Sequence, residues 1–306
     1  MSFIKGKSAL DKGKPIFKVD SFCACQNTVL DLVFLDDPRY ICAGSADQCV
    51  HFIDVSKCLT VNSLSGHSSS VKSLCSCGST IISGGRDAKI IGWDQREKKS
   101  CFVTDLKNQA TITSIASPND QMFISSDSRG KIILWDIRNP SRKFFSVPKV
   151  DGSGVSHITV SPDRKLLASI STNNVITLHK LDGTWAYLNR EYPNVNNFYN
   201  RCSFSPCSKY IAVGSSSGTI AVFSTKYAMK PSLLHGHSGA TNCVEWCRDN
   251  FDFILSCSDD KTVQLWSSEY KDTNQDEEEE IEEKLQIPIP KAKSVEQSYT
   301  LYKYVK

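Results

Sequence analysis

A strand-like segment recurs along this chain at a nearly constant interval, and each copy ends in a large or ring-bearing residue. These end residues are Ile53, Trp93, Trp135, His179, Phe223 and Trp266. Successive copies are 40, 42, 44, 44 and 43 residues apart. An interval of roughly 40–45 residues, together with Trp-Asp dipeptides, is typical of four-stranded β-propeller blades. The sequence therefore predicts an all-β propeller with six recognisable units.

The recurring segments have the composition of β-strands. Residues 89–93, 131–135 and 262–266 combine β-branched, aliphatic and aromatic side chains, and helical periodicity is absent throughout. Turn-forming Ser-Pro-Asp and Ser-Pro-Cys sequences, at 161–163 and 205–207, separate earlier strands at the matching place in their units. We therefore expect the propeller to occupy residues 26–270.

Two of the units carry the same set of polar residues. One set is His67, Ser83, Asp87 and Trp93, and the other is His237, Ser256, Asp260 and Trp266. The sets resemble those of WD-repeat blades, in which hydrogen bonds run from a turn aspartate through histidine and a hydroxyl to the indole N–H. Such pairing makes a buried carboxylate tolerable. A catalytic interpretation is disfavoured, because the set recurs at the repeat interval and includes the tryptophan.

The other units depart from this pattern. Ile53, His179 and Phe223 replace the tryptophan, and Asn173 and Ser217 replace the turn aspartate. A histidine at a tryptophan position is expected to pack in the blade, so we interpret His179 as a packing substitute and not as a metal ligand.

The two ends of the chain are assigned by their patterns. Residues 1–25 form an N-terminal segment, in which residues 15–22 alternate like a strand and are expected to supply the outer strand of the blade that closes the propeller. Residues 271–306 form an acidic linker and a tail, in which residues 298–305 have the pattern of one further strand. Six blades follow from the visible units, and seven would require the termini to build another.

Charge and hydropathy exclude some classes of protein. The formal net charge is +3, although residues 276–283 alone carry seven negative charges. This acidic run is typical of a solvated segment, and the modest positive excess elsewhere indicates no nucleic-acid site. No stretch approaches 18 uninterrupted apolar residues, and the start of the sequence lacks the apolar region of a secretory signal. We expect an intracellular protein that does not enter a membrane.

The thirteen cysteines are expected to be buried thiols and not disulfides, given the absence of a secretory signal. The Cys-x-x-Cys spacing that is typical of zinc sites does not occur. The pairs Cys23/Cys25 and Cys75/Cys77 have a one-residue spacing, which places both thiols on one face of a strand. No metal and no cofactor are therefore expected.

Two tetrapeptides of the form Trp-Asp-x-Arg carry the strongest functional signal. They end at Arg96 and Arg138, in the turns that follow the third strands of two adjacent units. A blade core does not require an arginine at this place. Because the two turns are adjacent, we expect the guanidinium groups to project side by side. Arginine is a common interface anchor, since its planar fork makes several directed hydrogen bonds.

The sequence resembles the denticleless family of substrate receptors for cullin–RING ubiquitin ligases of the cullin-four type. The paired Trp-Asp-x-Arg motifs are the signature of such receptors. The resemblance covers about residues 27–267. Besides the motifs, it rests on residues 84–87, 198–199, 203–206, 236–238, 244–247 and 257–260.

This resemblance implies a partner and a role. The implied partner is the large multi-propeller adaptor of the damaged-DNA-binding complex, and the implied role is ubiquitination of cell-cycle and DNA-replication substrates displayed on the replication sliding clamp. The location would be nuclear, with the cytoplasm as a second site. The implied adaptor-binding residues are Trp93, Asp94, Arg96, Trp135, Asp136 and Arg138. The chain departs from the family in lacking one N-terminal blade's worth of sequence and the long tail with a clamp-binding box.

Substrate choice is expected on the opposite face. Arg86 and Arg129 lie in the turns between the second and third strands of the same two units. No phosphate loop or acid–base pair stands out, so we expect no enzymatic activity. The alternative to a ligase receptor is a general WD-repeat scaffold for a nuclear or chromatin complex, in which the arginines have no adaptor role.

Overall fold

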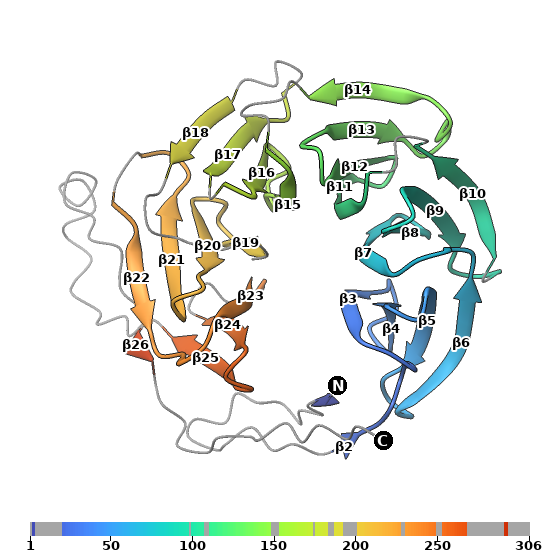
Figure 1. The fold of residues 1–306 in the computed structure, drawn as a ribbon, viewed down its shortest axis with the longest axis horizontal. Helices are drawn as coiled ribbons and strands as arrows, with labels where there is room; N and C mark the ends of the chain where they lie inside the picture. Colours follow the sequence, from blue (N-terminus) through green and yellow to red (C-terminus); the bar gives the residue numbers. More distant parts are fainter. Residues whose placement is uncertain are drawn as a thin grey trace. The chain divides into compact units, whose positions relative to one another are not determined.

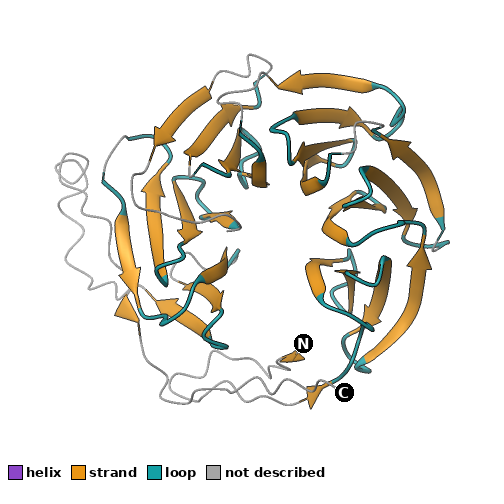
Figure 2. Cartoon of the chain, in the orientation of Figure 1, coloured by secondary structure: helices purple, strands orange, loops and turns teal. Residues whose placement is uncertain are grey.

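All regular structure in the described part of this protein is β-strand (Figure 2). The computed structural model describes residues 2–3, 20–97, 99–106, 110–147, 153–173, 175–182, 187–191, 201–227, 230–248, 253–267 and 291–292. Within these ranges, no helix is long and apolar enough to cross a membrane. The chain divides into two compact units. One contains residues 1–160 and 171–173, and the other contains residues 161–170 and 174–306.

The first unit contains three four-stranded antiparallel sheets and the first strand of a fourth (Figure 1). Blade 1 is formed by β3 (Val29–Phe34), β4 (Tyr40–Ser45), β5 (Cys49–Asp54) and β6 (Leu59–Ser65). Blade 2 is formed by β7 (Val71–Cys77), β8 (Thr80–Gly85), β9 (Lys89–Asp94) and β10 (Ser100–Asp105). Blade 3 is formed by β11 (Ile112–Asn119), β12 (Met122–Asp127), β13 (Ile132–Asp136) and β14 (Lys143–Val147).

Three more sheets have the same strand order. Blade 4 is formed by β15 (Val155–Val160), β16 (Leu166–Ser171), β17 (Val175–Lys180) and β18 (Tyr187–Glu191). Blade 5 is formed by β19 (Cys202–Phe204), β20 (Tyr210–Gly214), β21 (Thr219–Ser224) and β22 (Ser232–His235). Blade 6 is formed by β23 (Thr241–Trp246), β24 (Phe253–Ser258), β25 (Val263–Ser267) and β26 (Lys291–Ala292).

These six sheets are the blades of a WD-repeat β-propeller, as the sequence predicts. The six end residues of the recurring segments all lie on the third strand of a blade. The predicted boundary of the propeller at residue 270 and the further strand over 298–305 lie outside the described residues. Of the predicted closing strand, residues 20–22 are described: Asp20–Ser21 forms β2, which pairs with β1 (Ser2–Phe3). The outer strand next to β25 is β26.

The same left-handed turn precedes the third strand in five of the blades. Its last residue has a positive φ at Gln48, Ala88, Gly130, Gly218 and Lys261. Glycine adopts this conformation without strain, whereas a side chain disfavours it. Only two of the five residues are glycine, so the hydrogen bonds around the turn must hold the other three in place. The short turn then fixes the register between the second and third strands.

The hydrophobic cores of the first unit lie between consecutive sheets. Between blades 1 and 2, Val50 and Phe52 on β5 belong to the same buried cluster as Val71, Leu74 and Trp93 of blade 2. The third strand of blade 2 contributes Ile91 to this cluster and Ile90 to the cluster with blade 3, so it is covered on both sides, which explains its continuous apolar sequence. The corresponding cluster between blades 2 and 3 contains Ile82, Ile90, Ile112, Phe123 and Trp135.

The polar sets of blades 2 and 6 form the two chains of hydrogen bonds that the resemblance to WD repeats implies. In blade 2, His67 Nδ1 lies 3.0 Å from Asp87 Oδ1, and its Nε2 lies 2.8 Å from Ser83 Oγ. The indole N–H of Trp93 donates to the same hydroxyl at 2.8 Å. The hydroxyl therefore joins two side chains that would otherwise bury unpaired polar groups.

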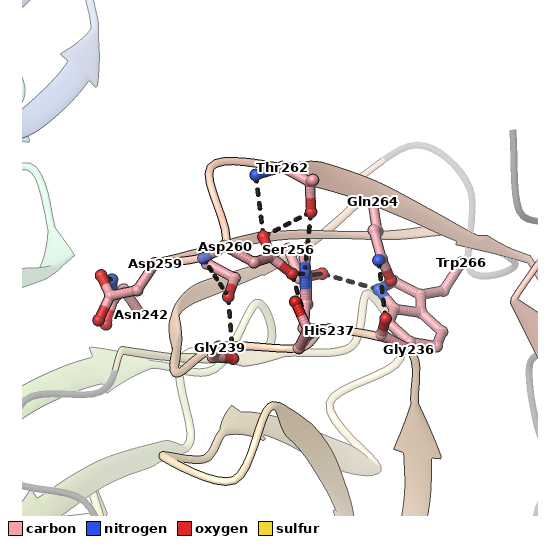
Figure 3. A network of polar contacts seen from close by, with 12 residues as sticks. Gly236, His237, Gly239, Asn242, Ser256, Asp259, Asp260, Thr262, Gln264 and Trp266 are labelled. Carbon is pink, nitrogen blue, oxygen red and sulfur yellow. Dashed lines mark hydrogen bonds and ion pairs between the residues drawn. The ribbon is translucent and has the colours of Figure 1, made fainter. Parts of the chain in front are cut away.

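Blade 6 repeats this geometry closely (Figure 3). His237 Nδ1 lies 2.8 Å from Asp260 Oδ2, and its Nε2 lies 2.7 Å from Ser256 Oγ. The Trp266 indole N–H donates to Ser256 Oγ at 2.8 Å. A Cβ added to the preceding Gly236 would lie 2.8 Å from the indole, so only glycine lets the histidine segment approach the tryptophan.

The remaining blades keep part of the chain of hydrogen bonds. In blade 3, Trp135 donates to Ser125 Oγ at 2.8 Å. In blade 4, His179 is fully buried and its Nε2 lies 3.3 Å from Ser169 Oγ, which is the geometry expected of a substitute for tryptophan. Burial lowers the pKa of His179 from 6.5 to about 4.

Replacing Ser256 by alanine should destabilise the protein by about 1–3 kcal/mol, because it leaves a buried indole N–H and an imidazole nitrogen without a partner. Urea unfolding followed by circular dichroism measures the change. The matched control is Ser100→Ala, at an exposed position of β10. Equal midpoints for the two variants would contradict the role assigned to the buried hydroxyl.

The pKa of His179 predicts a loss of stability in acid. In the unfolded chain this imidazole binds a proton near pH 6.5, and in the folded chain only near pH 4. The contribution of neutral His179 to the free energy of unfolding is therefore complete above pH 6.5 and is lost as the pH falls toward 4. The full difference is about 3 kcal/mol, since one unit of pKa difference corresponds to about 1.4 kcal/mol. His179→Phe should flatten the dependence of unfolding free energy on pH over this window. His235→Gln, at an exposed position of β22, should leave it unchanged.

Candidate functional site

The two Trp-Asp-x-Arg sequences lie at the ends of β9 and β13, where each third strand turns toward the outer strand of its blade (Figure 1). Trp93 and Trp135 are 2% and 1% exposed, and both are hydrogen bonded inside their blades. They cannot touch a partner directly. Any contribution that they make to binding passes through the turn that they anchor.

The aspartates of these sequences close the turns. Asp94 Oδ1 accepts the backbone N–H groups of Arg96 at 2.7 Å and Glu97 at 2.9 Å. These two bonds lower the pKa of the Asp94 carboxyl. Asp136 Oδ1 likewise accepts the backbone N–H of Arg138 at 2.9 Å. A short acceptor side chain two residues before the donor is the usual way to stabilise such a turn.

The third residue of each sequence fastens the turn to the first hairpin of its blade. The Gln95 N–H donates to the carbonyl of Ser79 at 3.2 Å, and the Ile137 N–H donates to the carbonyl of Gln121 at 2.9 Å. Three of the four residues of each sequence are therefore used by the blade itself. The arginine side chain of each sequence is exposed.

Blade 1 shows that this turn does not require an arginine. There Asp54 accepts the backbone N–H groups of Ser56 and Lys57, both at 3.0 Å. Ser56 thus occupies the place of Arg96 and Arg138. Since serine supports the same turn, the arginines of blades 2 and 3 need an explanation outside the turn.

The two arginines differ in how they are held. The Arg138 guanidinium donates to both carboxylate oxygens of Asp136, from Nε at 2.9 Å and from Nη2 at 2.6 Å, while its side chain stays 66% exposed. This contact, followed by the bond from the Arg138 backbone, lowers the pKa of Asp136 to about 2. Arg96 is exposed, and no described residue accepts a hydrogen bond from its guanidinium. The side-by-side arrangement of the two groups stays a prediction.

Arg86 and Arg129 lie at the opposite ends of the same third strands. Both are exposed, and a strand of five or six residues separates them from Arg96 and Arg138 by about 20 Å. The two residues are not equivalent in the repeat. Arg129 precedes Trp135 by six residues, just as Asp87 precedes Trp93 by six residues. Blade 3 therefore has an arginine where blade 2 has the turn aspartate. Counting back from the tryptophan identifies this substitution.

One group of potential metal ligands was not predicted from the sequence. Asp47, Cys49 and His51, in the turn before β5 and on β5, place one ligand atom each within 4.8 Å of one another. Their spacing of two residues is the signal that points to them, because alternate residues of a strand share a face. All thirteen cysteines are free thiols. Their burial is only partly as expected: four are buried, and the others are intermediate or exposed.

Comparison with known proteins places the chain among WD-repeat proteins. The family model "WD domain, G-beta repeat" matches residues 16–54, 57–94, 195–224 and 230–267. The Danio rerio "Denticleless protein homolog" is 25% identical over 289 residues, which is 79% of this chain and 45% of that protein. The Homo sapiens protein of the same name is 23% identical over 290 residues, 78% of this chain and 40% of that protein.

A protein with a different name is also similar. The Arabidopsis thaliana "WD repeat-containing protein 26 homolog" is 24% identical over 246 residues, covering 78% of this chain and 40% of that protein. The chain thus spans less than half the length of these curated relatives. Repeat sequence and blade structure agree that this chain is built from WD40 repeats, and it is similar to the curated denticleless proteins.

Proposed function

We propose that this chain is a non-catalytic substrate receptor of a cullin-four RING ubiquitin ligase. Arg96 and Arg138 would contact the ligase adaptor, the large multi-propeller subunit of the damaged-DNA-binding complex. The protein would present cell-cycle and DNA-replication substrates for ubiquitination in the nucleus. The observation that carries the proposal is the pair of arginine-bearing turns in adjacent blades, at a place where blade 1 has the same turn with Ser56.

The chemistry of these turns suits an adaptor contact. Each exposed guanidinium stands on a turn whose backbone is held by an aspartate and by the first hairpin of the blade. A rigid base reduces the entropy lost when a long side chain is fixed at an interface. Arg138 keeps donor groups beyond those used by Asp136, because a guanidinium has five N–H groups.

A receptor role also fits what the polar sets do. The hydroxyls of Ser83 and Ser256 are 0% and 2% exposed and accept an indole N–H. A serine in this position is closed to a substrate. The histidines and aspartates of both sets stabilise the fold. Their structural role favours a protein that binds other proteins over one that catalyses a reaction.

Substrates would bind at the other end of the third strands. Arg86 and Arg129 are exposed there, and their charge favours a segment of substrate with acidic side chains. Adaptor and substrate would then occupy opposite ends of the same two blades. Such a separation lets one propeller hold both partners at once.

Replacing Arg96 and Arg138 together by alanine should weaken adaptor binding by at least about 30-fold, since truncation of an arginine anchor costs about 2 kcal/mol or more. Surface plasmon resonance with purified adaptor measures the change. Thermal unfolding should be unaffected, because neither guanidinium contributes to the blade core.

The matched control exchanges the other two arginines of the same blades. Arg86→Ala with Arg129→Ala should leave adaptor affinity within about twofold. Retention of full adaptor affinity by the Arg96/Arg138 variant would reject the proposal, and it would favour a general scaffold role in its place.

The same two double variants predict the reverse pattern for substrates. In a ubiquitination assay with the assembled ligase, Arg86→Ala with Arg129→Ala should reduce capture of an acidic substrate while the adaptor stays bound. Affinity purification from nuclear extract, followed by mass spectrometry, identifies the proteins to be tested. Equal recovery of every such protein by this variant and by the unchanged chain would contradict the assignment of these arginines to substrate binding.

A further inference from the structure

Blade 1 lacks the hydrogen-bonded set of blades 2 and 6 but keeps its aspartate. In the register of the strands, Cys25, Ala43 and Ile53 stand where blade 2 has His67, Ser83 and Trp93. Asp47 stands in the place of Asp87. The backbone contact of the aspartate is also kept: the Gln26 N–H donates to Asp47 Oδ2 at 3.1 Å, as the Ser68 N–H donates to Asp87 Oδ2 at 2.8 Å.

Two other side chains approach this carboxylate. His51 Nε2 lies 3.0 Å from both oxygens of Asp47, and the Cys49 thiol completes a group whose ligand atoms all lie within 4.8 Å. The side chains of His51 and Asp47 are 7% and 13% exposed. This group is therefore nearly enclosed, and Asp47 and Cys49 keep partial exposure to solvent.

The histidine is oriented from behind. His51 Nδ1 lies 2.8 Å from Ser63 Oγ on β6, so the imidazole turns Nε2 toward Asp47. A hydrogen bond to the second ring nitrogen is the usual support of a metal-ligating histidine. Ser63 is exposed, and its hydroxyl can accept the Nδ1–H of His51.

Cys25 is the candidate for a fourth ligand, from outside the group of three whose ligand atoms lie within 4.8 Å of one another. Blade 6 shows that its place faces that of Cys49, because the equivalent residues His237 and Thr262 approach to 3.1 Å there (Figure 3). Burial and the nearby Asp47 carboxylate raise the pKa of the Cys25 thiol to about 11. The segment that carries Cys25 is itself held in place, since Thr60 Oγ1 donates to the carbonyl of Ala24 at 2.8 Å.

We propose that Cys25, Asp47, Cys49 and His51 bind a structural zinc ion. Two thiolates, one imidazole and one carboxylate form a set that Zn²⁺ accepts in tetrahedral geometry. Bonds of about 2.0–2.3 Å to the ion require ligand atoms roughly 3.3–3.8 Å apart. The ligand atoms of Asp47, Cys49 and His51 lie within 4.8 Å of one another, so the side chains would close around the ion as it binds. The ion would fasten the turn before β5 to the segment before β3, which is what the histidine does in blades 2 and 6.

The opposing explanation needs no metal. In it, the contact of His51 with Asp47 replaces the missing histidine of the blade, and the two cysteines are incidental. The two explanations differ in what the thiols do, since only a bound ion requires Cys25 and Cys49 as thiolates.

Cobalt(II) is the probe that separates them, because thiolate ligands give it a strong charge-transfer absorption and tetrahedral geometry gives it intense visible bands. The intact chain, stripped of metal and kept reduced, should bind about one Co²⁺ with both features. Cys25→Ser and Cys49→Ser should each remove about half of the charge-transfer absorption, and the double variant all of it. Zinc added to the cobalt form should abolish the spectrum.

A positioning role for Ser63 has its own readout. Ser63→Ala should weaken zinc affinity about 10- to 100-fold in competition with a chelator dye, with the cobalt spectrum at saturation unchanged. Cys58→Ser, at a cysteine of the same blade outside the group, is the matched control and should change neither quantity. Circular dichroism confirms that each variant is folded.

Absence of charge-transfer absorption in the unchanged chain at saturating cobalt would overturn the proposal. So would an unchanged spectrum in the Cys25/Cys49 double variant, because the cobalt would then lie elsewhere. Full loss on Cys49→Ser with no change on Cys25→Ser would overturn the assignment of Cys25. These outcomes are independent of adaptor binding, which the arginine variants test separately.

Discussion

The hydrogen bond from a third-strand tryptophan to a serine hydroxyl on the second strand is the interaction on which the blades depend most. It is present in blades 2, 3 and 6 at the same distance of 2.8 Å. An indole supplies a large apolar surface for the core between blades but brings one N–H that must be paired. The serine supplies the acceptor from within the same sheet. Once that pair is in place, the end of the third strand is fixed, and the turn that follows can carry residues chosen for other purposes.

The turn after the third strand shows how a repeat separates folding from function. An aspartate accepts the backbone N–H groups of this turn in blades 1, 2 and 3, and the next residue bonds to the first hairpin. The residue after that is free to vary: it is Ser56 in blade 1 and arginine in blades 2 and 3. An interface built at this place costs the fold little, because the turn is already satisfied by its own backbone and aspartate. The same reasoning applies to the turn before the third strand, where Arg129 has taken the place of the aspartate in blade 3.

The repeat interval made the third strands and both complete hydrogen-bonded sets predictable from sequence, since each depends on residues at fixed distances from Trp93 or Trp266. His179 could be placed for the same reason, and its burial beside Ser169 agrees with that interpretation. The group around Asp47 could not be found this way. The prediction used residues that recur from unit to unit, and blade 1 lacks three of them. Cys25, Ala43 and Ile53 stand where the histidine, serine and tryptophan of the set would be. The two-residue spacing of Asp47, Cys49 and His51 can be seen in the sequence, but the strand register is needed to show which members of the set blade 1 lacks.

A turn aspartate without its histidine partner leaves an enclosed carboxylate whose negative charge must be stabilised in another way. The carboxylate is still held by a backbone N–H, and it is too enclosed for solvent alone to stabilise its charge. Blades 2 and 6 solve this with a histidine from the preceding segment. Blade 3 has Arg129 at this place, and its turn is held by the buried Asp127, which accepts the backbone N–H groups of Arg129 and Lys131. Blades 4 and 5 replace the aspartate with Asn173 and Ser217. In blade 1 the carboxylate of Asp47 remains, and the imidazole of His51 approaches it from β5, with Nε2 3.0 Å from both oxygens. The departures of the six blades from one pattern are therefore alternative answers to a single electrostatic constraint.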